Sequence, residues 1–168
     1  MEMNLSLKNN RGLVEYCEAQ LGRPYWYGTF GRKASQAIYD YNRKRYPKMY
    51  AATDYPSQYG LKVHDCIGLL KGYMWCKDAD DTNPVYKSNG FDDWSANGFY
   101  SHCVRKSTNM AEMPDIPGIA VFMNGHVGIY IGDGWVIEAR GHAYGVVKTR
   151  LKDRKWTKWA YIEEIQYL

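Results

Sequence analysis

The sequence has no long hydrophobic run and only a small excess of positive charge. No stretch approaches the roughly 20 apolar residues of a membrane-spanning helix, so membrane insertion is not expected. Residues 1–20 lack the apolar segment and the small-residue cleavage site of a secretory leader, which predicts synthesis in the cytoplasm without a signal peptide. The formal charge of +4 and a single basic run at 43–45 are too weak to predict a nucleic-acid partner.

Cysteine is also scarce, and the four cysteines form neither a CxxC pair nor the spacing of a zinc site. This pattern argues against a thioredoxin-type redox motif and a structural zinc ion, so no metal and no cofactor are expected. Cys66 and Cys76 fall on one predicted helix almost three turns apart, which is too far for a disulfide. A bridge between other cysteines is left open.

Helical spacing of apolar residues is confined to the first part of the chain. We expect helices at 10–21 with Asn10 as N-cap, at 33–46, and at 64–76 with His64 or Asp65 as cap. The segment 32–62 is interpreted either as a solvated surface element or as a lid that contacts substrate. Residues 77–115 are polar and irregular, with a short helix near 92–100.

The last third of the chain changes to strand patterns. Residues 118–150 alternate β-branched residues with glycine-bearing turns, which predicts an antiparallel meander. A further strand is expected near 159–165. Helices followed by strands, with no repeat and no linker, predict one α+β domain over residues 1–168.

Cys66 starts the most hydrophobic of the predicted helices. The first N–H groups of a helix have no intrahelical partner, and the helix dipole favours an anion there. A thiol at this position can have a lowered pKa and act as a nucleophile, and the same N–H groups can stabilise an oxyanion. The alternative is a buried and inert cysteine.

His126 begins a strand whose register can be predicted from its hydrophobic pattern. Placing the apolar residues of this strand and the next on one face pairs Ile131 with Trp135 across a three-residue loop at 132–134. Glu138 then lies on the same face as His126, one diagonal step away and within reach of a side-chain contact. A cysteine, a histidine and a carboxylate that orients the histidine form the set used in nucleophilic catalysis.

Two residues compete for these contacts. Arg140 is expected directly opposite His126 and could bind the carboxylate of Glu138 instead. His142, four residues after Glu138, is an alternative third member of the catalytic set.

Four motifs, taken in order, resemble those of the NlpC-type cell-wall peptidases, a papain-like family. They are PYWYG at 24–28, DCIGL at 65–69, PGIAVF at 117–122 and GHVGIYIGDGWVIEA at 125–139. The tail KDRKWTKWAYIEEI at 152–165 is similar to the end of phage lysins of this group. Segments 32–62 and 77–115 match no pattern of the family.

The resemblance implies a papain-like core with N-terminal helices, in which a nucleophile at a helix N-terminus packs on an antiparallel β-sheet. It makes Cys66 the nucleophile, His126 the base and Glu138 the orienting residue. The family usually has His, Asn or Gln in that third position, so Glu138 places a charge beside the imidazole and should favour a thiolate–imidazolium pair. Ile67 replaces the small Ser that usually follows the nucleophile.

The candidate substrate and oxyanion residues are Tyr27, Asp65 and His142. The resemblance places Tyr27 beside the thiol, and Asp65 is also expected to cap the helix. His64 is interpreted as a cap or a substrate contact rather than the base, and His102 as a surface residue.

The implied function is hydrolysis of an amide bond in the stem peptide of peptidoglycan. The family contains both endopeptidases that cut after D-glutamate and amidases that cut between muramic acid and L-alanine, and the sequence does not choose between them. The missing leader and the lysin-like tail favour a phage endolysin, or an effector that reaches the wall by dedicated export. The alternatives are a thiol-dependent acyltransferase, a non-catalytic wall-binding module on the same fold, and, ranked last, a metal hydrolase using His64, Cys66 and His126.

Overall fold

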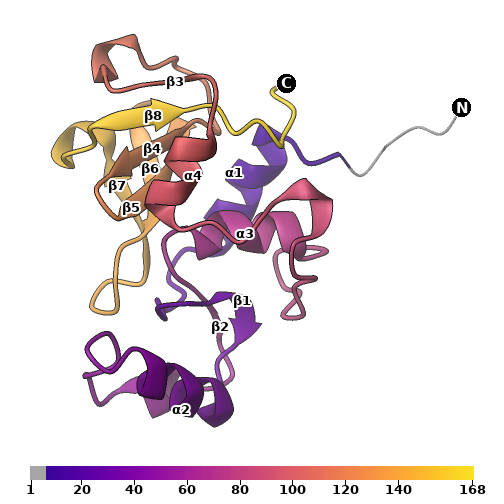
Figure 1. Cartoon of the computed structure of the whole chain (residues 1–168), viewed down its shortest axis with the longest axis vertical. Coiled ribbons are helices and arrows are strands. Elements are labelled where there is room, and N and C mark those ends of the chain that lie inside the picture. The colour runs from indigo at the N-terminus through magenta and orange to yellow at the C-terminus, as the bar shows by residue number, and fades with distance from the viewer. Residues whose placement is uncertain (1–6) are drawn as a thin grey trace, which may run out of the picture.

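The structure is a computed structural model that describes residues 7–168 (Figure 1). Residues 1–6 lie outside the described residues. Two predictions include them: the single domain over residues 1–168 and the absence of a leader in residues 1–20. Among the described residues, no helix is both long enough and apolar enough to cross a membrane.

Helices precede most of the strands along the chain. The α-helices of the described part are α1 (Asn10–Ala19), α2 (Gln36–Arg45), α3 (Gly68–Trp75) and α4 (Ala96–His102). Short 3-10 turns occur at η1 (Tyr55–Gln58), η2 (Ser88–Gly90), η3 (Met110–Glu112) and η4 (Leu151–Asp153).

The strands form two antiparallel sheets. The smaller sheet pairs β1 (Phe30–Lys33) with β2 (Lys62–His64). The larger sheet has the order β3-β8-β4-β5-β6-β7. Its strands are β3 (Lys106–Ser107), β4 (Ala120–Met123), β5 (His126–Gly132), β6 (Trp135–Ala139), β7 (Val146–Arg150) and β8 (Lys158–Ala160). The predicted α+β class and the antiparallel meander are confirmed, whereas the last strand is shorter than expected.

The N-cap of the first helix lies one residue earlier than predicted. Asn9, not Asn10, is the N-cap, and its side-chain oxygen accepts a hydrogen bond of 2.8 Å from the Gly12 amide. Asn10 is buried and joins distant parts of the chain, because its side chain donates to the Pro117 carbonyl and accepts from the Leu168 amide, both at 2.8 Å. The C-terminus is thereby held against α1.

Helix α3 begins at Gly68, later than predicted, because residues 62–64 pair with β1 as a strand. His64 is therefore neither a cap nor a substrate contact: it is fully buried, and its Nε2 lies 2.7 Å from the Tyr16 hydroxyl. Burial lowers the pKa of His64 well below its ordinary value. Gly68 lets α3 pass close to the preceding loop, since a Cβ there would lie 1.9 Å from the Thr29 carbonyl oxygen.

The predicted register of the β5–β6 hairpin holds along the strands but not at the turn. Ile129 pairs with Ile137, as expected, whereas Gly132 rather than Ile131 is the partner of Trp135. The turn is the two-residue Asp133-Gly134, with φ values of 54° and 80°. Two residues with positive φ suit the twist of a tight hairpin, and the register shift before Gly132 accommodates them.

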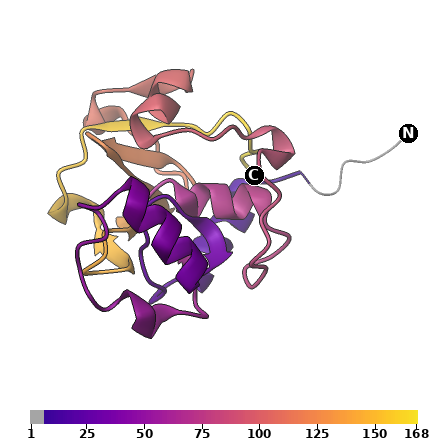
Figure 2. The same ribbon diagram turned by 60° about the horizontal axis from the view of Figure 1, so that its bottom comes forward.

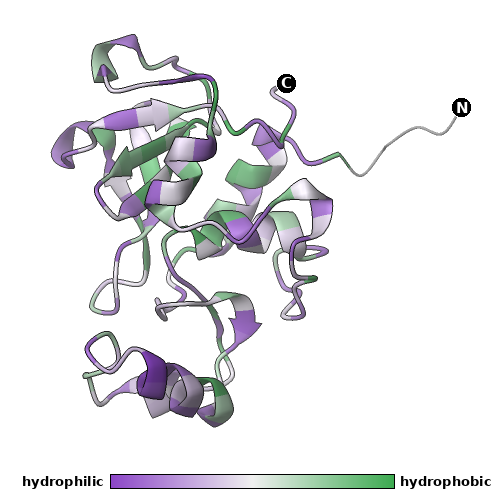
Figure 3. Cartoon of the chain, in the orientation of Figure 1, coloured by the Kyte–Doolittle hydropathy of each residue, from purple (hydrophilic) through white to green (hydrophobic). Residues whose placement is uncertain are grey.

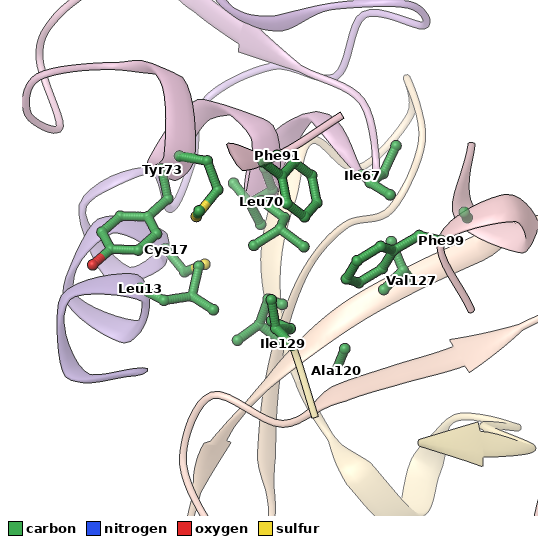
Figure 4. Packing of buried hydrophobic residues seen from close by; sticks show 14 of the residues in the cluster. Leu13, Cys17, Ile67, Leu70, Tyr73, Phe91, Phe99, Ala120, Val127 and Ile129 are labelled. Carbon is green, nitrogen blue, oxygen red and sulfur yellow. The ribbon is translucent and has the colours of Figure 1, made fainter. Parts of the chain in front are cut away.

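The larger sheet has an apolar core on each face. One face packs Val127 and Ile129 against α1 and α3, where Leu13, Leu70 and Ile67 meet them (Figure 4). Ile67, in the place of the family's Ser, is an anchor of this core with 3% exposure. The other face is covered by tryptophans of the C-terminal tail. Apolar residues accordingly concentrate in the strands and in α3, while hydrophilic residues are frequent on α2 (Figure 3).

The segment that contains α2 has a small aromatic core of its own. It lies at the lower end of Figure 1 and in front in Figure 2. Its buried residues are Trp26, Ala34, Tyr50, Tyr55 and Val63. Tyr41, on α2, lies outside this core and is 60% exposed.

Candidate active site

Cys66 lies in the turn between β2 and α3, two residues before the helix starts. Its thiol sulfur is 4.0 Å from the carbonyl oxygen of Gly125, and the amides of Ile67 and Val127 are placed to stabilise a thiolate. These contacts bring the sulfur against the backbone on either side of His126. The nucleophile predicted on the helix side therefore lies against the backbone of the residues that flank His126, the base predicted on the sheet side.

The pKa of the Cys66 thiol is raised, whereas its position near a helix start predicts a lowered pKa. Burial and the charge of Asp65 outweigh the backbone amides and raise the pKa of the thiol to about 12. The local effect of a helix start is thus smaller than the cost of removing a thiolate from water. In this arrangement the resting thiol is neutral, and a base must remove its proton for attack.

His126 opens β5 and is oriented from two sides. Its Nε2 lies 2.7 Å from Oε1 of Glu138, which leaves Nδ1 available for the thiol. The imidazole stacks on the indole of Trp156, with ring centroids 5.5 Å apart and planes 15° from parallel. The ring is thereby held in one plane.

Glu138 is fully buried and accepts four hydrogen bonds. One comes from His126, one from the Thr149 hydroxyl at 2.6 Å, and two from Arg154, whose Nε and Nη2 lie 2.9 and 2.8 Å from the two carboxylate oxygens. Burial opposes the charge, but these bonds prevail and hold the pKa of Glu138 at about 2. The predicted diagonal contact with His126 is present, and Arg154 rather than Arg140 pairs with the carboxylate.

Three residues that hold this arrangement were missed from the sequence: Thr149, Arg154 and Trp156. A signal for Thr149 exists, because it pairs with Val136 and so shares the face of Glu138. Arg154 and Trp156 follow the irregular η4 turn, so the strand pattern cannot predict which way their side chains point. In the sequence, these two residues are marked only by their place in the lysin-like tail.

Gly128 makes room for this set of side chains. A Cβ at this position would lie 2.8 Å from a Val136 methyl carbon, 2.9 Å from the indole of Trp156 and 3.3 Å from Cβ of Glu138. Contacts under 3.0 Å require a neighbour to move. The absence of a side chain at Gly128 therefore allows Trp156 to cover the face on which His126 and Glu138 meet.

A cleft of about 400 Å³ opens beside Cys66. Tyr27 and Asp65 both line it. The carboxylate of Asp65 is committed to the backbone: one oxygen caps α3 through the Gly68 amide at 2.6 Å, and the other accepts from the Gly28 amide at 2.9 Å. Partial burial raises the pKa of Asp65, and its structural role is to fix the loop carrying Tyr27 beside the nucleophile.

His142 is not brought to this cleft. Its Nε2 lies 2.5 Å from a carboxylate oxygen of Asp54, and its ring stacks on Tyr55 with centroids 4.2 Å apart. The glycine-bearing turn after β6 leads it toward the segment 46–61, away from Glu138. His102 contacts Glu164 at 2.7 Å and stacks on Trp94, where it is partly exposed.

The donor set for a metal hydrolase is not assembled either. Within residues 7–168, no three His, Cys, Asp or Glu side chains gather as a metal site. All four cysteines, which fall in the described part, are free thiols.

No protein-family profile matches the sequence, and no curated protein sequence matches it. Solved structures do. NlpC1 from Trichomonas vaginalis is 16% identical with a TM-score of 0.52, over 90% of this chain and 43% of that one. The NlpC/p60 domain of the peptidoglycan hydrolase SagA is 14% identical with a TM-score of 0.53, over 92% of this chain and 99% of the domain. The P60 domain of an antigen from Mycobacterium avium subspecies paratuberculosis is 16% identical with a TM-score of 0.53, over 94% and 96%.

The chain has the NlpC/p60 fold. The likeness covers nearly all of the SagA domain, whereas the chain spans less than half the length of NlpC1 and of NlpC2 from T. vaginalis. At these identities the NlpC/p60 likeness establishes architecture, and the chemistry has to be argued from the residues of this chain.

Proposed function

We propose that this protein is a peptidoglycan hydrolase that cleaves an amide bond of the stem peptide with Cys66 as nucleophile. The observation that carries the proposal is the 2.7 Å contact between His126 and a buried, ionised Glu138, next to a thiol that lines an open cleft. This is the nucleophile, base and orienting group of thiol catalysis, on an NlpC/p60 fold. SagA, with that fold, is described as a peptidoglycan hydrolase, which supports the choice of substrate.

The proposed reaction uses these groups in turn. Nδ1 of His126 takes the proton of the Cys66 thiol as the sulfur attacks the carbonyl carbon of the amide. The tetrahedral oxyanion is stabilised by backbone N–H groups at the start of α3. His126 then gives the proton to the leaving amine, the C–N bond breaks, and water hydrolyses the thioester to release the acid and restore the thiol.

The finer assignment is also part of the proposal. The cleavage is either endopeptidic after D-glutamate or amidic between muramic acid and L-alanine. The protein reaches the wall after release, as a phage endolysin, or by dedicated export, as an effector. The lysin-like tail and the DCIGL and GHVGIYIGDG segments support this assignment. The tail contributes Arg154 and Trp156 to the site.

The test is mass spectrometry of the soluble fragments released from purified peptidoglycan sacculi. We expect the wild-type protein to release stem-peptide fragments whose new termini identify the bond, and Cys66→Ala to release none. Cys103→Ala is the matched control, because it removes a buried thiol outside the cleft and should retain release. Release by Cys66→Ala would exclude the thiol mechanism. Labelled peptide transferred to an added amine without hydrolysis would favour the acyltransferase, and wall binding without any product would favour the binding module.

A further inference from the structure

A second cavity of about 550 Å³ adjoins the catalytic cleft. The two share Gly28, Phe30, Tyr46 and Asp93 in their walls, so the second cavity continues the first in the direction of α2. Seven further residues line it, and two of these, Arg32 and Arg45, carry a charge. The catalytic arrangement gives this extension no role.

The extension lies in the most basic part of the chain. Residues 32–48 contain six Lys or Arg and one Asp, whereas the other 151 residues contain sixteen Lys or Arg and seventeen Asp or Glu. The net positive charge of the protein therefore comes from the segment that forms this wall. An anionic group that enters the cleft is drawn toward that end.

The guanidinium of Arg45 is held in place by aromatic side chains. It donates to the Tyr41 hydroxyl at 2.7 Å and lies 5.2 and 5.6 Å from the ring centroids of Tyr41 and Tyr46. Such packing lowers the entropy lost when the guanidinium binds a ligand. Arg32 is exposed on β1, whose pairing with β2 fixes the backbone of that wall.

The acidic residue in the shared wall does not cancel this charge. The carboxylate of Asp93 is 2.5 Å from the ammonium of Lys71 and also accepts a hydrogen bond from the Tyr86 hydroxyl. Asp93 is thus paired from within the protein. Arg32 and Arg45 remain the cationic groups directed to a ligand in this cavity.

The segment is a fixed wall of the cleft and not a detached lid. The Tyr50 hydroxyl and the Asn42 side chain both donate to the carbonyl oxygen of Tyr27, which lines the cleft beside Cys66. The ring of Tyr46 packs on that of Tyr27 with centroids 4.9 Å apart. Substrate contacts made by this segment are therefore rigidly related to the nucleophile.

We propose that Arg32 and Arg45 form a subsite that binds a free carboxylate of the stem peptide while the scissile amide lies at Cys66. The inference rests on the proposed function. A guanidinium binds a carboxylate by two parallel, charge-assisted hydrogen bonds, and the stem peptide offers such groups on D-glutamate and on its diamino acid. The subsite makes the enzyme select walls whose carboxylates are free over walls in which they are amidated.

The experiment compares synthetic stem peptides that differ only in one carboxylate or carboxamide, first on D-glutamate and then on the diamino acid. Cleavage is followed by mass spectrometry, and kcat/KM is measured for each peptide. We expect the wild-type protein to prefer one free carboxylate by about tenfold or more, the effect of losing a charge-assisted hydrogen bond. The preferred peptide identifies which carboxylate is bound. In Arg32→Gln/Arg45→Gln the preference should fall to near one, because cleavage of the peptide with the free carboxylate slows.

The matched control is Arg43→Gln/Lys44→Gln, which removes two charges from the same helix without altering the cavity wall. It should keep the preference; a loss equal to that of the Arg32/Arg45 variant would mean that only overall charge matters. Equal cleavage of all peptides by the wild type would overturn the subsite while leaving the hydrolase intact. A defect of the Arg32/Arg45 variant on walls that carry phosphate polymers, but not on peptides, would also overturn it. No cleavage of any peptide or sacculus by the wild type would refute the proposed function itself.

Discussion

Arg154 is predicted to stabilise the protein in a way that depends on pH. Its guanidinium makes two of the four hydrogen bonds to the buried carboxylate of Glu138 and places a permanent positive charge beside that group. Replacing it in Arg154→Gln removes both bonds and the charge. Burial, which works against ionisation, is then opposed only by His126 and Thr149, so the pKa of Glu138 rises from about 2.

The magnitude follows from the pKa of Glu138. Its ordinary pKa is 4.5 and its folded-state pKa is about 2; at about 1.4 kcal/mol per pKa unit this difference contributes about 3 kcal/mol to folding. Because the folded-state pKa is the lower one, the contribution is fully present above pH 4.5 and is lost as the pH falls toward 2. Arg154 supplies two of the four hydrogen bonds behind this shift, so Arg154→Gln should be less stable than the wild type by up to about 3 kcal/mol at pH 7.

The assay is urea denaturation of both proteins at pH 7, 5 and 3, with the difference in free energy of unfolding taken at each pH. We expect the difference to be unchanged from pH 7 to 5 and to shrink by pH 3. Arg140→Gln is the control, because its guanidinium lies over the ring of Tyr144 and does not touch Glu138; it should show a small, pH-independent change. A pH-independent difference for Arg154→Gln, or none at pH 7, would refute this account.

Further predictions concern the chemistry and the backbone around it. Glu138→Gln should lower kcat by about tenfold to a hundredfold, less than the loss in His126→Ala, as measured by fragment release from sacculi; a silent Glu138→Gln would show that the carboxylate does not orient the base. Trp156→Leu should lower kcat by about tenfold with little change in KM, because it frees the imidazole plane; an unchanged kcat would contradict that role. Alkylation of Cys66 by iodoacetamide should keep accelerating up to pH 10, as expected for a thiol with a pKa of about 12, whereas a plateau below pH 8 would indicate a preformed thiolate. Gly68→Ala should lower the free energy of unfolding by about 1–3 kcal/mol in urea titrations, because its Cβ would meet the Thr29 carbonyl at 1.9 Å; wild-type stability would contradict that contact.

Alternation along the strands was enough to predict the central contact of the site. The period of two in β5 and β6, together with the need to bury one face, predicts that Glu138 reaches His126, and the 2.7 Å contact is present. The turn was predicted less well, because hydrophobicity does not distinguish a two-residue turn with a bulge from a three-residue loop. The error is confined to the turn at Gly132 and leaves the predicted positions of His126 and Glu138 unchanged.

Other parts of the site depend on contacts that no local pattern encodes. The sequence pattern predicts a helix from residue 64, whereas His64 ends a strand. β1 and β2 are too short to show alternation, and a long insertion separates them. The pKa of Cys66 was predicted with the wrong sign, because burial depends on which segments cover the thiol. Arg154 follows an irregular turn, so only the three-dimensional structure shows that it reaches Glu138.

Arg154 also explains how a glutamate can occupy a position where the resembled family usually has a neutral side chain. A lone carboxylate would favour a charged imidazolium and with it a preformed thiolate. The bidentate contact with Arg154 makes the pair neutral overall, so that the imidazole meets a hydrogen-bond acceptor with the net charge of an amide. In net charge, the Glu138–Arg154 pair then resembles Asn or Gln. An ionised oxygen of Glu138 still holds the imidazole of His126 by a hydrogen bond. A neutral pair at this position agrees with a thiol that stays protonated until His126 removes its proton during attack.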